Sequence, residues 1–258
     1  MLRPHRIVNA TNNDLLRRCV AEAVGTGLLI VAVIGSGIMA TRLSPDDVGL
    51  QLLENAIATG GALVALILAF GSVSGANFNP VVTWCEVALD GRAKIPALAY
   101  TIAQVIGGCV GAVVANVMFE LDAIDFSSKA RSSGALWTSE VVATAGLLLV
   151  IFGIARSGKA AMVPFAVGGW ITGAYFFTSS TSFANPAVTI ARTLSDSFAG
   201  IEPSSAPMFI VMQVIGLGVA IALIRYLFPT KGLRHDNSGS NADHRATTSH
   251  QEGHQPTT

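Results

Sequence analysis

The chain has 258 residues, of which 51% are hydrophobic and 12% charged, and its mean hydropathy is +0.56. Soluble domains carry roughly 25% charged residues, so this composition indicates a protein whose solvent is a lipid bilayer. The formal net charge of zero argues against a nucleic-acid partner. The cysteines, Cys19, Cys85 and Cys109, lie in apolar segments without C-x-x-C spacing, which predicts neither a disulfide framework nor a zinc site.

Six segments are long enough to cross a bilayer, which takes about 20 apolar residues. In chain order they are Leu15–Ala40, Leu52–Phe70, Ile95–Phe119, Leu136–Ala155, Ala160–Thr178 and Ala206–Phe228. Residues 1–14 before them are predicted to form a cytoplasmic segment. Residues 229–258 after them are polar and lack periodicity, which predicts a disordered cytoplasmic tail.

Two shorter apolar stretches remain, Asn79–Leu89 and Asn185–Leu194. As helices, each would extend about 17 Å at about 1.5 Å per residue, which is half of a hydrocarbon core. Both open with Asn-Pro, and this pair is typical of a helix start, since asparagine is a favoured N-cap and proline suits the first helical position. We therefore expect two re-entrant half-helices, although either Asn-Pro alone could mark a plain turn.

The two Asn-Pro motifs belong to an internal repeat. Ser74–Thr83 reads SGANFNPVVT, and Thr181–Ile190 reads TSFANPAVTI. Glu22 in the first span and Glu140 in the fourth each stand four residues before a threonine. Two matches in the same order within each half indicate a duplicated unit.

The halves, about residues 15–119 and 136–228, each contain three spans, so they would cross the membrane in opposite directions as an inverted repeat. The basic residues orient the chain. Among the 16 lysines and arginines, the ones predicted to lie outside are Arg42, Lys129, Arg131 and Arg192. The others satisfy the positive-inside rule if both termini are cytoplasmic.

In an inverted repeat, the two half-helices enter from opposite sides and their Asn-Pro starts meet near the midplane. With their oxygens used as caps, Asn79 and Asn185 would keep their side-chain NH₂ groups free to donate into a cavity. The two helix N-termini also place partial positive charge there, which disfavours cations. Glu22 and Glu140 are predicted to accept hydrogen bonds from backbone N–H groups of the re-entrant loops; a proton relay is the alternative.

These motifs resemble those of the major intrinsic proteins, the family of aquaporins and aquaglyceroporins, over roughly residues 15–228. Besides Ser74-Gly75-Ala76 and the two glutamates, the resemblance is carried by the midplane residues Asn79, Pro80, Val81, Asn185, Pro186 and Ala187. It implies an all-α membrane protein, with six transmembrane helices and two re-entrant half-helices in an aquaporin-like inverted repeat. It also implies that residues 15–228 form a channel domain and that four copies assemble as a homotetramer.

The sequence departs from the family's usual pattern where selectivity is set. Val81 replaces the usual alanine, Asn77 stands where histidine is common, and Val188 stands where the family usually has arginine. Carried over by spacing, the family's outer constriction consists of Thr59, Gly173, Ser182 and Val188. This ring contains no aromatic or charged side chain, so the resemblance implies a wide, arginine-free selectivity filter.

With Val188 and the phrase FANPAVTIARTL, the chain resembles a bacterial subgroup associated with arsenic-resistance operons. This resemblance implies a passive channel of the cell (inner) membrane for small uncharged solutes: glycerol-like polyols, water and neutral arsenicals such as arsenous acid. Arg192, one turn after Val188, is a candidate for the outer vestibule. The alternative is an interfacial arginine that reaches water or pairs with an outer acid.

Other functions remain open at this stage. An ordinary glycerol and water facilitator would need no arsenic role. A secondary transporter would also show inverted repeats, but it usually carries an ion-coupling pair at the midplane, and only Glu22 and Glu140 could serve. The predicted spans contain no histidine and no nucleophile–base constellation, so the sequence predicts no enzyme, no cofactor and no metal site.

Overall fold

The computed structural model describes residues 12–229, which contain helices and no β-strand. Six of these helices are long and apolar enough to cross a membrane. They are α1 (Asn12–Leu43), α2 (Val48–Ser74), α4 (Lys94–Met118), α5 (Gly134–Arg156), α6 (Val163–Phe177, preceded by the 3-10 turn η1, Ala160–Met162) and α8 (Ala206–Leu227). Two short helices complete the set: α3 (Pro80–Asp90) and α7 (Pro186–Ala191, followed by the 3-10 turn η2, Arg192–Leu194). The expected fold class is therefore confirmed.

The helix ends differ from the expected spans where polar residues extend a helix beyond its apolar stretch. α1 begins at Asn12, so the last residues of the predicted N-terminal segment belong to the first helix. α2 begins four residues early because the Asp47 side chain caps it, with Oδ1 accepting from the N–H of Leu50 at 2.9 Å. The predicted disordered tail, apart from its first residue, lies outside the described residues.

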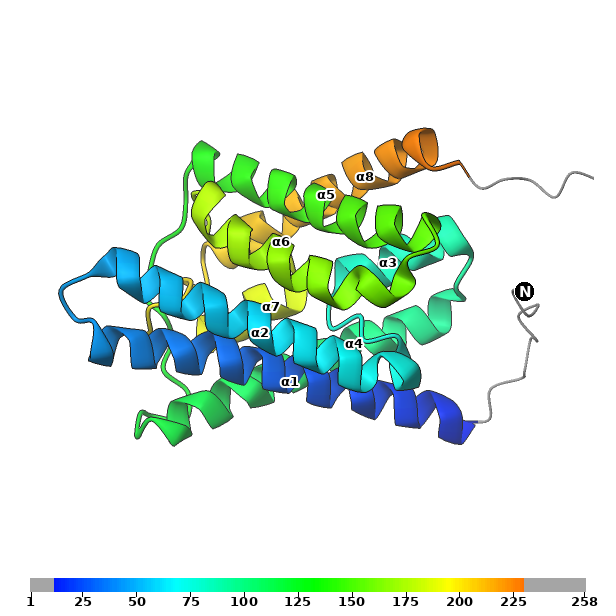
Figure 1. The fold of residues 1–258 in the computed structure, drawn as a ribbon. Helices are drawn as coiled ribbons and strands as arrows, with labels where there is room; N and C mark the ends of the chain where they lie inside the picture. The colour runs from blue at the N-terminus through cyan, green and yellow to red at the C-terminus, as the bar shows by residue number, and fades with distance from the viewer. Residues whose placement is uncertain (1–11, 230–258) are drawn as a thin grey trace, which may run out of the picture. The chain divides into compact units, whose positions relative to one another are not determined.

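The long helices run side by side, and α3 and α7 lie among them from opposite ends of the bundle (Figure 1). The helix pairs α1–α4 and α5–α8 pack closely at equivalent glycines of the two halves. A Cβ on Gly107 of α4 would lie 2.0 Å from the carbonyl oxygen of Ala23, and one on Gly216 of α8 would lie 2.9 Å from that of Val141. Only glycine permits this approach at Gly107, and the matching positions support the repeat.

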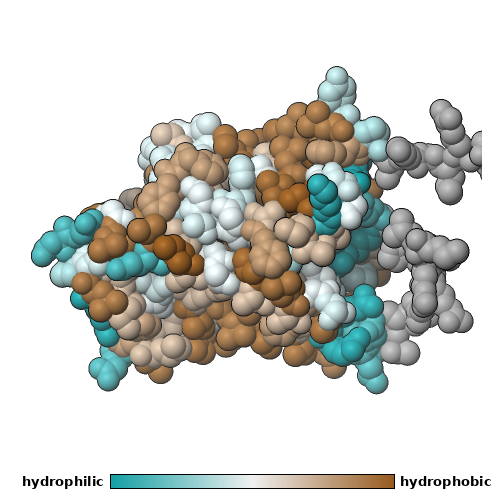
Figure 2. Space-filling model, in the orientation of Figure 1, coloured by the Kyte–Doolittle hydropathy of each residue, from teal (hydrophilic) through white to brown (hydrophobic). Residues whose placement is uncertain are grey.

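The surface has the pattern of a protein embedded in lipid. Figure 2 shows hydrophobic residues across the middle of the bundle and hydrophilic ones gathered toward its two ends. Exposed aliphatic side chains recur along the outer face of α4 at Leu98, Ile102, Ile106 and Val110. α1 begins and α8 ends on the same side of the bundle (Figure 1), as an even number of spans requires.

Candidate channel site

The two half-helices start at the centre of the bundle and are joined there by their asparagines. The Asn79 side-chain oxygen caps α3 by accepting from the N–H of Val81, and the Asn185 oxygen caps α7 by accepting from that of Ala187. Each side-chain nitrogen donates to the loop of the other half. Asn79 Nδ2 lies 2.8 Å from the carbonyl oxygen of Ala184, and Asn185 Nδ2 lies 2.8 Å from that of Phe78.

This reciprocal pair corrects the expectation that both NH₂ groups are entirely free. An amide nitrogen carries two hydrogens, and the cross-loop bond uses one of them in each asparagine. One donor on each side chain is left, and both Asn79 and Asn185 line the central cavity. The same bonds tie the two halves of the repeat together at their point of contact.

The loop before α3 is held by a buried carboxylate. Glu22 is fully buried and accepts hydrogen bonds from the backbone N–H groups of Asn77 at 3.0 Å and Phe78 at 2.7 Å. The hydroxyl of Ser74 also donates to it, at 2.5 Å. The carboxylate of Glu22 therefore satisfies donors that would otherwise be unpaired in an apolar interior.

The loop before α7 is held in the same way. Glu140 is fully buried, and its two oxygens accept from the backbone N–H groups of Phe183 and Ala184, each at 2.9 Å. Neither Glu22 nor Glu140 is among the residues that line the cavity. These contacts are the ones that a scaffold role requires, and they leave no direct path from either carboxylate to a solute.

The two loops share an unusual backbone conformation that needs this support. Left-handed φ angles occur four, three and one residues before each capping asparagine, at Gly75, Ala76 and Phe78 in one half and at Thr181, Ser182 and Ala184 in the other. Residues other than glycine adopt this conformation at a cost of about 1–3 kcal/mol each. Such strain persists only where surrounding contacts fix the backbone, and the buried glutamates supply those contacts.

The glutamates also set the direction of the loop carbonyls. In a trans peptide, each N–H points opposite to the C=O of the preceding residue. Since four loop N–H groups point at the carboxylates, the carbonyls before them point away, and these carbonyls belong to Ala76, Asn77, Ser182 and Phe183. All four residues line the cavity, so the loops present acceptors toward it.

Two glutamines complete the scaffold, and the sequence interpretation missed them. Gln104 Nε2 donates to Glu22 at 2.7 Å and to the hydroxyl of Thr83 at 3.1 Å. Gln213 Nε2 makes the equivalent bonds to Glu140 at 2.7 Å and to the Thr189 hydroxyl at 2.9 Å. A signal was present, because the phrase Gln-Val-Ile-Gly occurs once in each of these two helices.

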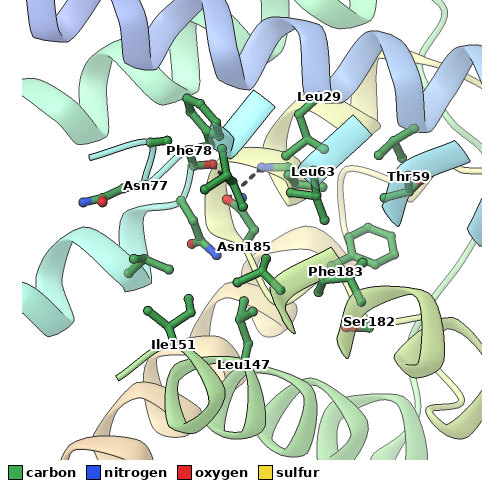
Figure 3. Close-up of a pocket in the computed structure, with 18 of the residues that line it drawn as sticks. Leu29, Thr59, Leu63, Asn77, Phe78, Leu147, Ile151, Ser182, Phe183 and Asn185 are labelled. Atoms are coloured by element: carbon green, nitrogen blue, oxygen red, sulfur yellow. Dashed lines mark hydrogen bonds between the residues drawn. The ribbon is translucent and has the colours of Figure 1, made fainter. Parts of the chain in front are cut away.

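A cavity of about 140 Å³ passes along the half-helix starts, with room for several water molecules. Its walls are apolar stripes with helical spacing, contributed by Leu29 and Val33 of α1, Leu63 and Ile67 of α2, Leu147 and Ile151 of α5, and Val163, Val167 and Ile171 of α6. Figure 3 shows Asn77 toward one end, Thr59, Ser182 and Phe183 toward the other, and Asn185 between them. Polar groups thus occur at the centre and at the ends.

The cavity wall includes three of the four residues expected in the outer ring. Thr59, Ser182 and Val188 line the cavity, but Gly173 does not, and Tyr175 lines it instead. The Tyr175 hydroxyl lies 3.1 Å from that of Thr59. The reason is helical phase: Val167, Ile171 and Tyr175 are four residues apart and share one face of α6, whereas Gly173 turns toward Phe177.

Arg192, the candidate for the outer vestibule, lines the same cavity, so an arginine contributes to this wall although Val188 occupies the family's usual arginine position. Arg192 is only 2% exposed to solvent, and its guanidinium carbon lies 3.4 Å from the centre of the Phe183 ring. Nε donates to the carbonyl oxygen of Ala199. The terminal nitrogens have no hydrogen-bond partner within residues 12–229 and are not sealed from the cavity. No ion pair in this range involves Arg192. The burial of Arg192 and the absence of an acidic partner in residues 12–229 therefore argue against an interfacial arginine that reaches water or pairs with an outer acid.

A second buried arginine lies on the same phenylalanine. Arg131, in the connection between α4 and α5, has its guanidinium carbon 5.1 Å from the centre of the Phe183 ring. It donates to the carbonyl oxygens of Gly200 at 2.9 Å and Ser180 at 3.3 Å. Burial lowers the pKa of Arg131 to about 10, so it keeps its charge at neutral pH. Sequence reasoning placed it only in an outer loop.

The remaining midplane residues serve the helix starts. Pro80, Val81, Pro186 and Ala187 are buried, and none of them is among the residues that line the cavity. Within α3, the valine that lines the cavity is Val82, one position after Val81. The departure from the usual alanine at Val81 therefore changes packing behind the cavity wall.

The fold and this site define a membrane channel built as an inverted repeat, and comparisons with known proteins agree. Residues 9–182 match the major intrinsic protein family. The chain is 50% identical over 215 residues to the aquaglyceroporin AqpS of Rhizobium meliloti (strain 1021), covering 83% of this chain and 91% of that one. It is 28% identical over 246 residues to the aquaporin AqpM of Methanothermobacter marburgensis, covering 83% and 98%.

The fold matches the X-ray structure of the aquaglyceroporin from Plasmodium falciparum with a TM-score of 0.66. The match covers 84% of this chain and 96% of that one, at 19% identity, and shows a shared fold. The chain belongs to the major intrinsic protein family. It is a multi-pass membrane channel of the aquaporin and aquaglyceroporin type and not an enzyme, as expected from the sequence.

Asn185→Asp is expected to make the channel leak cations. The substitution exchanges the NH₂ donor for a carboxylate oxygen 2.8 Å from the carbonyl oxygen of Phe78, and it adds a negative charge where two helix N-termini disfavour cations. Voltage clamp of the variant should show sodium or proton current. Asn116→Asp is the matched control, because buried Asn116 also donates through Nδ2 to a backbone carbonyl, that of the partly buried Leu194 at 2.9 Å, and does not line the cavity. A variant as tight as the parent would place the cation barrier elsewhere.

Proposed function

We propose that this protein is a passive channel for small uncharged solutes: glycerol-like polyols, water, and neutral arsenicals such as arsenous acid. The observation that supports this most directly is the central cavity, with apolar walls and hydrogen-bonding groups at its centre and at its ends. A polyol that replaces its water shell with these groups, while its carbon side contacts the walls, crosses with a small desolvation penalty. A cation would also meet the partial positive charge of the two helix N-termini and the guanidinium of Arg192.

The narrow outer part of the pore is proposed to be a ring of Thr59, Tyr175, Ser182, Val188 and Arg192. Three of these residues carry hydroxyl groups and one carries a guanidinium. Val188 places two methyl groups where the family's usual arginine would project. The guanidinium in this ring comes instead from Arg192, one helical turn further along the chain. This arrangement favours a wider opening than an arginine at Val188 would leave, and it supports passage of solutes at least as large as glycerol.

The arsenical part of the proposal rests on chemistry, and the polyol part is supported by a relative. Arsenous acid is an uncharged trihydroxide at neutral pH, with a donor pattern similar to that of a small polyol. The relative from Rhizobium meliloti that shares half of the aligned residues is itself an aquaglyceroporin. The alternative, a glycerol and water facilitator without an arsenic role, differs only in the solute that matters in the cell.

We further propose a homotetramer in the cell (inner) membrane with both termini in the cytoplasm. The orientation is supported by the placement of basic residues and by the common side of the start of α1 and the end of α8. The exposed aliphatic faces of the long helices offer surface for both lipid and neighbouring copies. Chemical cross-linking of the purified protein would test the tetramer.

The channel function is tested by flux into proteoliposomes. Vesicles that contain the protein should take up glycerol and arsenous acid faster than protein-free vesicles, along a gradient of either direction and without a proton gradient. A secondary transporter would instead saturate sharply or require a coupling ion. Proton-driven accumulation of solute against its gradient would overturn the proposal.

Val188→Arg is expected to narrow the outer ring. Val188 lines the cavity and is 6% exposed, so a guanidinium there would share the space with that of Arg192. Permeability to glycerol and arsenous acid should fall at least about tenfold, which corresponds to an added barrier of about 1.4 kcal/mol, and water should be affected less. Val188→Ile is the matched control for bulk without charge. Stopped-flow swelling of vesicles with equal protein content measures the permeabilities to solute and to water. An unchanged glycerol permeability would show that Val188 does not line the narrowest part of the pore.

A further inference from the structure

The end of the cavity opposite the Thr59 ring carries a carboxylate. Glu86, near the end of α3, lines the cavity together with Asn77, which Figure 3 places toward this end. Only one oxygen of Glu86 is engaged. Oε2 accepts from Asn77 Nδ2 at 2.9 Å and from Arg92 Nε at 2.8 Å. The Glu86 side chain makes no hydrogen bond to Glu22 or Glu140, although the backbone N–H of Asn77 belongs to the scaffold.

The other oxygens of this cluster are available to a solute. Glu86 Oε1 and Asn77 Oδ1 have no hydrogen-bond partner within residues 12–229, and neither is sealed from solvent. The carbonyls of Ala76 and Asn77 also point away from Glu22 toward the cavity. This end of the pore therefore presents several acceptors, one of them a carboxylate oxygen. The N–H donors of Asn79, Asn185 and Arg192 lie at the centre and at the other end.

The charge of the carboxylate is balanced in place. The guanidinium carbon of Arg92 lies 4.9 Å from the centre of the Tyr100 ring, and the Tyr100 hydroxyl donates to the carbonyl oxygen of Ser74 at 2.9 Å. These contacts keep Arg92 beside Glu86. Its neighbours on the same side, Asp90 and Arg156, pair with each other at 3.4 Å. The acceptor oxygens are thus presented without a large net negative charge.

We propose that Glu86 and Asn77 form a subsite that accepts hydrogen bonds from the O–H and N–H groups of permeating solutes. The channel then prefers donor-rich solutes, such as polyols, amides and arsenous acid, over donor-free solutes of the same size. This inference rests on the proposed channel function and adds a second point of selection, at the end of the pore away from the Thr59 ring. Arg92 acts as a positioning residue that orients the carboxylate.

Glu86→Gln tests the subsite with almost no change of shape. The single oxygen of glutamine can still accept from Asn77 and Arg92, which turns its NH₂ group toward the cavity and replaces an acceptor by a donor. The probes are urea and dimethyl sulfoxide, which have equal numbers of non-hydrogen atoms, the first rich in donors and the second without any. The ratio of their permeabilities, corrected for protein-free vesicles, should fall about tenfold, as expected for one lost bond to a charged acceptor.

Asp90→Asn is the matched control. Asp90 is an acid of the same helix, its side chain is 53% exposed, and it does not line the cavity. The ratio of urea to dimethyl sulfoxide permeability in this variant should therefore equal that of the parent. Glu86→Leu should lower urea and glycerol flux selectively, with dimethyl sulfoxide unchanged. If Glu86 only fastens α3, both probes will change equally or not at all, and the subsite is wrong. A parent that conducts no solute would instead refute the channel function itself.

Discussion

Replacing Glu140 with alanine is expected to prevent the channel from folding, and replacing Glu22 is expected to have at least as large an effect. Without Glu140, the N–H groups of Phe183 and Ala184 lose their acceptor in a dry interior. The amide of Gln213 loses one of its two acceptors and keeps only the Thr189 hydroxyl. Each unpaired donor costs about 1–3 kcal/mol. The sum is comparable with the total stability of about 5–15 kcal/mol of a typical protein.

The loop conformation adds to this effect. Thr181, Ser182 and Ala184 keep left-handed φ angles of 63°, 53° and 49°, and the carboxylate of Glu140 holds the segment in that conformation. Once it is removed, the backbone is free to relax, which would rotate the carbonyls away from the cavity and displace Asn185. Folding and conduction should therefore fail together.

The measurement is the yield of monodisperse protein in detergent, followed by thermal unfolding and by flux at several pH values. Glu54→Ala is the matched control, because Glu54 Oε1 accepts only from the Ser44 hydroxyl, at 2.9 Å, and holds no re-entrant loop. Glu140→Gln keeps one acceptor oxygen, so its yield and its unfolding temperature should lie between those of the alanine variant and the parent. Normal yield combined with flux that tracks protonation would favour a proton relay over the scaffold.

Much of the architecture was predictable because it depends on patterns among residues that are close together in the sequence. Apolar length gave the six spans, and the Asn-Pro caps gave α3 and α7, since a cap and the residues it bonds are neighbours in sequence. The intramembrane position of Glu22 and Glu140 indicated buried acceptors, and the structure shows them bonded to the two loops. The repeat itself implied that the two half-helices meet.

The cavity wall was less predictable because it depends on helix rotation and on distant segments. Spacing carried over from the family chose Gly173, although the stripe Val167, Ile171 and Tyr175 was visible at a period of four. For Arg192 the spacing of one turn from Val188 indicated a vestibule position, but it did not indicate where the guanidinium points. Its direction is set by the ring of Phe183 before α7 and by the carbonyl of Ala199 after η2, two contacts that exist only once the chain has folded.

Arg192→Leu is expected to open the channel to cations while neutral solutes still pass. The guanidinium is buried, has no acidic partner within residues 12–229 and faces the cavity. At about 4 Å and an effective dielectric constant of about 20, one such charge repels a passing cation by about 4 kcal/mol. This corresponds to roughly a thousandfold in rate, which makes the substitution one of the most informative in the chain. Glycerol flux should stay equal or rise, since leucine leaves more space.

Two further variants separate charge from packing. Arg192→Lys keeps the charge but loses the planar stack on Phe183, and it should remain largely tight to sodium and protons. Arg131→Leu removes the other arginine that stacks on the Phe183 side chain. Arg131 does not line the cavity, so this variant should conduct no cations if the barrier is the charge of Arg192 itself. Proton and sodium currents at equal amounts of folded protein decide the matter. If Arg192→Leu stays tight while Asn185→Asp conducts, cation exclusion resides at the midplane, and Arg192 serves only to shape the outer opening.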